Sequence, residues 1–115
     1  MSEFVVDTSY PEDNIAMLNV QGFLDAHTFE DMEKAVEEVF QKGVYKLVVL
    51  LGQVTYISSA GAGVFIAALG KAQENGGNVI LVSPTDNVKE VFDLLGLTQI
   101  FTFASNPQEG IKGFE

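Results

Sequence analysis

The chain has 115 residues, no cysteine and a formal net charge of −10, from 16 acidic and six basic side chains. This length fits one ordinary domain, which we place at residues 1–115, and the apolar share of 47% is enough for a core without metals or disulfides. The missing cysteines exclude disulfides and cysteine-ligated metals, and the acidic balance argues against binding to nucleic acid or to an anionic membrane surface.

The first third of the chain predicts a hairpin followed by an amphipathic helix. Two strand-like runs in residues 3–22 surround the turn signal "PEDN". In the second run one face carries Ala16, Leu18 and Val20, and the other carries Ile15, Met17, Asn19 and Gln21. Residues 24–43 place apolar side chains at helical spacing opposite an acidic face: Phe29, Met32, Val36, Val39 and Phe40. Asp25 or Thr28 is the expected N-cap, and Gly43 the expected stop.

The rest of the chain alternates strands and helices. Apolar runs predict strands at residues 45–51, 78–83 and 99–105. Helical patterns lie at residues 61–77, 86–96 and 106–114. The first of these helices carries the small residues Ala62, Ala67 and Ala68, and the second places Val88, Val91, Phe92 and Leu95 on one face. The order β-β-α-β-α-β-α-β-α predicts an α/β fold with a mixed sheet of about five strands, antiparallel in the hairpin and parallel afterwards.

The stretch "TYISSAGAGVF", residues 55–65, allows several chemistries. A serine nucleophile could use His27, the only histidine, with Asp25, but the elbow signature G-x-S-x-G is absent. The glycines lack the Gly-Lys-Ser/Thr ending of a Walker A loop, and no metal-ligand spacing occurs. We therefore expect no catalytic residue, no metal and no cofactor, with a serine hydrolase and a small nucleotide-binding domain as alternatives. At a helix start a serine caps unpaired N–H groups, and the same groups accommodate a phosphoserine.

Over nearly its whole length the chain resembles the STAS domain family, in the stand-alone form of bacterial anti-sigma factor antagonists. "VQGFLDAHT" is similar to the family's G-x-L-D-x-x-T, and "VTYISSAGAGVF" is similar to its V-x-F-x-D-S-S-G-L-G-V-L. "AQENGGNVILVSP" and "VKEVFDLLGLTQIF" match further family segments. The resemblance implies the STAS fold and a binding protein rather than an enzyme.

The resemblance also implies partners and a regulatory site. In this family the unphosphorylated protein binds an anti-sigma factor and frees the sigma factor. The anti-sigma factor is also a serine kinase that phosphorylates the antagonist and ends the interaction, and a serine phosphatase reverses this. We expect the same partners here in the cytoplasm, with no nucleic acid and no membrane. Aligning the family's glycines on Gly61 and Gly63 places the phosphorylated serine at Ser59. The implied partner-binding residues are Gly22, Leu24, Asp25, Thr28, Ser58, Ser59, Ala60, Gly61, Ala62 and Gly63.

The chain departs from the family at two acidic positions. The Asp before the phosphorylated serine is Ser58 here, and an Asp or Asn at the end of the third strand is Leu50, with the loop "LGQ" in place of "DLS". Ser58 can form hydrogen bonds, but it cannot help to hold the kinase's metal ion as a carboxylate could. A one-residue slip would make Ser58 the target, but it would break the match at the glycines, where we expect close backbone approach. A STAS scaffold that is not phosphorylated is therefore an alternative function.

Overall fold

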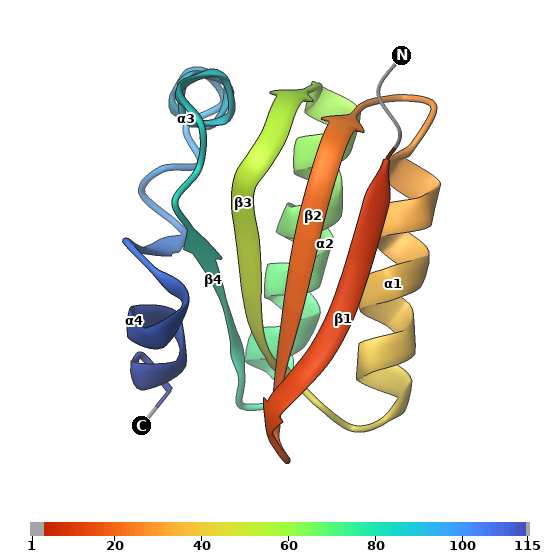
Figure 1. The fold of residues 1–115 in the computed structure, drawn as a ribbon, viewed down its shortest axis with the longest axis vertical. Coiled ribbons are helices and arrows are strands. Elements are labelled where there is room, and N and C mark those ends of the chain that lie inside the picture. Colours follow the sequence, from red (N-terminus) through yellow and green to blue (C-terminus); the bar gives the residue numbers. More distant parts are fainter. Residues whose placement is uncertain (1–3, 115) are drawn as a thin grey trace.

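The computed structural model describes residues 4–114, which form a five-stranded mixed sheet with helices on both faces (Figure 1). The elements are β1 (Val5–Glu12), β2 (Ile15–Leu24), α1 (Phe29–Gln41), β3 (Lys46–Ile57), α2 (Ser59–Glu74), β4 (Asn78–Val82), α3 (Asp86–Leu94), β5 (Thr102–Ala104) and α4 (Pro107–Lys112). The strands lie in the order of the chain, with β1 antiparallel to β2 and every later pair parallel. The predicted α/β class, element order and mixed sheet are confirmed.

The main core lies between one face of the sheet and helices α1, α2 and α3. The side of β2 with Ala16, Leu18 and Val20 is fully buried there, as the alternation predicts. Helix α1 buries its apolar stripe on the same face and leaves its carboxylates exposed. Helix α3 adds Val88 and Phe92, and the Phe92 ring lies 5.5 Å from that of Phe101. The burial of these apolar side chains is the main source of stability.

Helix α4 covers part of the opposite face (Figure 1). Gly110 lies so close to the sheet that a Cβ there would be 2.8 Å from Cγ1 of Val48. Ile111 follows Gly110 in α4 and packs beside Val82 in a second, smaller apolar cluster. None of the helices within residues 4–114 is both long and apolar enough to cross a membrane.

Several predicted details are wrong. β3 does not end at Leu51 but continues through "LGQ" to Ile57, because β2 runs on to Leu24 and supplies hydrogen-bonding partners beyond the end of β4. Helix α2 begins at Ser59 instead of Gly61. Leu95 does not continue the buried face of Val88 and Phe92 but is 46% exposed, because α3 ends at Leu94.

The turn after α2 brings the backbone of Gly77 against the start of β3. A Cβ at Gly77 would lie 1.8 Å from the carbonyl oxygen of Tyr45. The chain must stay at this distance, because the N–H of Asn78 donates to the same oxygen at 3.1 Å. Only a residue without a side chain fits between these two backbones.

We expect Gly77→Ala to lower the free energy of unfolding by more than about 2 kcal/mol, because the backbones must separate. Gly70→Ala is the matched control: Gly70 is exposed within α2 and has open space around it, so alanine should raise stability by about 0.5–1 kcal/mol. Urea denaturation of both variants measures the effect. Equal stability of the two variants would contradict this account of Gly77.

Candidate functional site

The predicted site lies where β2 and β3 end side by side. The backbone N–H of Ser58 donates to the carbonyl oxygen of Leu24 at 2.9 Å, and Leu24 pairs with Ile57 in the parallel register. The loop after β2 and the start of α2 therefore share the carboxyl edge of the sheet. Ligand sites of open α/β sheets lie at this edge. The structure thus brings the two sequence motifs, "GFLDAHT" and "TYISSAGAGVF", into one place.

The two serines of this edge have different roles. Ser58 is the N-cap of α2, and its Oγ accepts a hydrogen bond from the N–H of Gly61 at 3.3 Å. Ser59 is the first residue of the helix and is exposed, whereas Ser58 is half-buried. The first turn of α2 contains no acidic residue. No carboxylate of this turn therefore neutralises the partial positive charge of the helix N-terminus, and Ser59 lies next to that charge.

The two glycines of the motif also differ. A Cβ at Gly61 would be 2.6 Å from the carbonyl oxygen of Leu24, so the predicted need for close backbone approach is confirmed there. At Gly63 a Cβ would meet nothing within 4 Å, so the same expectation is wrong for Gly63. Residues two positions apart along an α-helix lie on nearly opposite sides of it, so Gly63 does not share the contact that Gly61 makes with Leu24.

Three of the predicted partner-binding residues are buried. Leu24 and Ala62 are fully covered in the core, and Gly61 is buried against Leu24. These residues fix the backbone of the edge but cannot touch a partner. The other predicted residues are exposed or half-exposed and form the accessible part of the site: Gly22, Asp25, Thr28, Ser58, Ser59, Ala60 and Gly63.

The loop between β2 and α1 is closed by its own side chains. The hydroxyl of Thr28 donates to the carbonyl oxygen of Phe23 at 2.7 Å and accepts the N–H of Asp25 at 2.9 Å. The Asp25 carboxylate accepts the backbone N–H of His27 at 2.9 Å. Thr28 occupies the N-cap position of α1, but its side chain makes no capping bond, so that part of the capping prediction is wrong. Gly22 has a φ of 101° next to a shift in strand pairing, a conformation that favours glycine.

Sequence reasoning missed three residues of this edge. Phe23 and Tyr56 pair across β2 and β3, with ring centroids 6.0 Å apart, and are 45% and 44% exposed. The side-chain oxygen of Asn87 in α3 accepts the N–H of Ile57 at 3.2 Å, one residue before Ser58. The aromatic pair is found only when the strand register is known. The hydrogen bond between Asn87 and Ile57 joins residues 30 positions apart, so no local sequence pattern predicts it.

The acidic side chain and the histidine of this edge are arranged around the backbone of the loop. Within residues 4–114 no group of histidine and acidic side chains is placed to hold a metal ion. The Asp25 carboxylate binds the backbone of His27, so it orients the loop and not the imidazole ring. What this edge presents is an exposed hydroxyl at a helix N-terminus, together with two exposed aromatic side chains near the ends of β2 and β3.

Comparisons with known proteins agree with this architecture. The profile of the STAS domain matches residues 9–110. An anti-sigma-B factor antagonist of Staphylococcus epidermidis is 27% identical over 88 residues, which cover 76% of this chain and 82% of that protein. The crystal structure of the Thermotoga maritima protein TM1081 is 26% identical, with a TM-score of 0.84 over 96% of this chain and 92% of that one. The anti-sigma factor antagonist SpoIIAA in its unphosphorylated form has the same fold, with 22% identity and a TM-score of 0.82 over 96% of both chains.

The unequal space around the two glycines predicts opposite effects of alanine. Gly61→Ala should lower the free energy of unfolding by about 2 kcal/mol or more, because its Cβ would collide with the backbone of β2. Gly63→Ala should be neutral or stabilising, because the helix gains a better helix former in open space. Thermal unfolding of the two variants distinguishes them. A similar loss of stability in both would refute the packing argument.

The unequal roles of the serines predict a second difference. Ser58→Ala removes the N-cap bond of α2 and should cost about 1 kcal/mol of stability. Ser59→Ala leaves that cap intact and should change stability by less than about 0.5 kcal/mol. Urea denaturation provides the comparison, with the same dependence of the unfolding free energy on urea concentration fitted for both variants. If Ser59→Ala were the more destabilising variant, the assignment of the cap to Ser58 would be wrong.

Proposed function

Because this chain belongs to the STAS domain family, we propose that it is an anti-sigma factor antagonist, a regulatory binding protein and not an enzyme. It binds an anti-sigma factor and thereby frees a sigma factor. The names of relatives such as the Staphylococcus epidermidis protein support this role. The site supports it as well, since an exposed edge with aromatic side chains suits protein binding.

Binding is switched off by phosphorylation of Ser59. The observation that carries this proposal is the division of roles at the helix start: Ser58 makes the cap, and Ser59 is exposed and free to react. The N-terminus of α2 stabilises an anionic group. The fold is compatible with both states, because SpoIIAA has been described in an unphosphorylated and a phosphorylated form.

The phosphate acts at the contact surface and not on the fold. It adds about −1.5 to −2 charges at pH 7 and three acceptor oxygens to the exposed start of α2. A partner whose surface fits the neutral hydroxyl would have to bury this charge, which is costly. The kinase is the anti-sigma factor itself, a serine phosphatase restores binding, and the exchange takes place in the cytoplasm.

The test is incubation with ATP and the anti-sigma factor kinase of the same organism, followed by mass spectrometry. We expect one phosphate on Ser59, no modification of Ser59→Ala and normal modification of Ser58→Ala. Ser59→Glu should weaken capture of the anti-sigma factor by at least about tenfold, while Ser59→Ala retains it. Phosphate on Ser58, or normal modification of Ser59→Ala, would overturn the site.

One observation favours a second function, that of a STAS scaffold without phosphorylation. Ser58 stands where the family has an Asp, and its hydroxyl is engaged by Gly61. The kinase would then lack a carboxylate next to its target. Under this alternative the anti-sigma factor fails to modify the chain even when the two proteins form a complex. Introducing the family's carboxylate with Ser58→Asp, which also caps a helix well, should then make Ser59 a substrate.

A further inference from the structure

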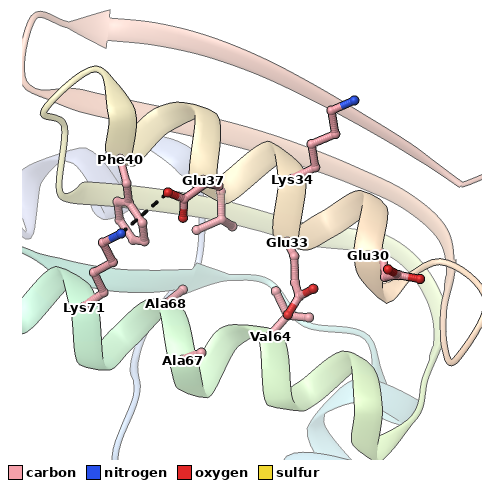
Figure 2. Close-up of a pocket in the computed structure, with 10 residues that line it drawn as sticks. Glu30, Glu33, Lys34, Glu37, Phe40, Val64, Ala67, Ala68 and Lys71 are labelled. Carbon is pink, nitrogen blue, oxygen red and sulfur yellow. Dashed lines mark ion pairs between the residues drawn. The ribbon is translucent and has the colours of Figure 1, made fainter.

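A groove of about 440 Å³ lies between α1 and α2 (Figure 2), and Ser59 is not one of the residues that line it. Its floor is apolar and includes Val64 and Ala67 of α2, and Phe40 of α1 lies at one end. Ala67 is exposed, whereas Val64 is buried. The groove is open to solvent along the helices, so a chain segment can reach its floor.

The rim of the groove on α1 is negatively charged. Glu30, Glu33 and Glu37 follow each other at helical spacing, about 4.5 and 6 Å apart along the helix axis. Figure 2 shows Glu33 reaching toward Val64, whereas Lys34 points away from α2. Lys34 also lines the groove, but its ammonium forms no ion pair with Glu30 or Glu33, so the carboxylate of Glu33 faces α2 without a cation of α1 beside it.

At one end the groove already holds a cation of the chain. The ammonium of Lys71 lies 3.6 Å from the Glu37 carboxylate and 5.4 Å from the centre of the Phe40 ring. This is the only ion pair within residues 4–114, so the carboxylates of Glu30 and Glu33 are not matched by a cation of the described chain. The other end of the groove therefore combines the carboxylates of Glu30 and Glu33, which form no ion pair, with the apolar side chains of Val64 and Ala67.

From this charge pattern we propose that the groove binds a basic amphipathic helix of a partner protein. Two arginines one turn apart pair with Glu30 and Glu33, in the way that Lys71 pairs with Glu37. Their aliphatic stems and an adjacent leucine cover Val64 and Ala67. A helix laid along two helices buries its apolar face in the groove between them. The inference goes beyond the proposed function, since it does not involve modification of Ser59.

The probe is a synthetic end-blocked helical peptide with two arginines one turn apart and leucines on the adjacent face. Titration into the ¹⁵N-labelled protein, followed by NMR, should give saturable shifts centred on the amides of Glu33, Val64 and Ala67. The double variant Glu30→Lys, Glu33→Lys should weaken binding by at least about tenfold. Ser59→Ala and Ser59→Glu should bind as the unmodified protein does, which keeps this test separate from that of the switch.

The matched control is Asp31→Lys, Glu38→Lys, which makes the same change of charge on exposed positions of α1 outside the groove. It should reduce binding by less than about threefold, through general electrostatics only. Equal weakening by both double variants, shifts centred on another face, or tight binding of a peptide with glutamine in place of arginine would each overturn the proposal. Ala67→Trp, which fills the groove without changing charge, should also reduce binding by at least about tenfold.

Discussion

The arrangement of this protein depends on one carbonyl group, that of Leu24 at the end of β2. It accepts the N–H of Ser58 and lies so close to Gly61 that no side chain fits between them. One group thus fixes both the end of β3 and the first turn of α2. Because Ser58 is held at this point, its hydroxyl is positioned to cap the helix, and the next residue is turned out to solvent.

Other elements reinforce this point of contact from the side. Asn87 of α3 binds the N–H of Ile57, and the hydroxyl of Thr85 donates to the carbonyl oxygen of Val54 at 2.8 Å. Thr28 closes the loop that follows Leu24. Three side chains at the starts of α1 and α3 thus pair with backbone groups of β2 and β3 near this edge. The exposed hydroxyl of Ser59 therefore stands on a rigid base, as a recognition site requires.

Local patterns in the sequence were sufficient for the fold but only partly for the site. Alternation in β2 and the helical spacing of Met32 and Phe40 report burial directly, so the elements and the core were predictable. The length of β3 was not, because it depends on pairing with a neighbour strand. The contact between Phe23 and Tyr56 could not be predicted either, because it depends on the same pairing register between β2 and β3. Family motifs pointed to Ser58 and Ser59 as site residues, but only the structure shows that Ser58 caps the helix and Ser59 is exposed.

The two surfaces carry opposite electrostatic character. The start of α2 has the partial positive charge of a helix N-terminus, whereas the flank of the same helix faces the carboxylates of α1. Val64 lies only five residues after Ser59. One helix can therefore serve two contacts that differ in the charge they select.

The agreement between strand order and chain order has a consequence for how the molecule is assembled. Every strand after the first pairs with the strand that precedes it in the chain. No strand has to be inserted between two others that are already paired. During synthesis, when the N-terminal part emerges first, each βα unit can dock on a growing edge as soon as it leaves the ribosome. Nascent chains of increasing length should thus gain protected amides strand by strand.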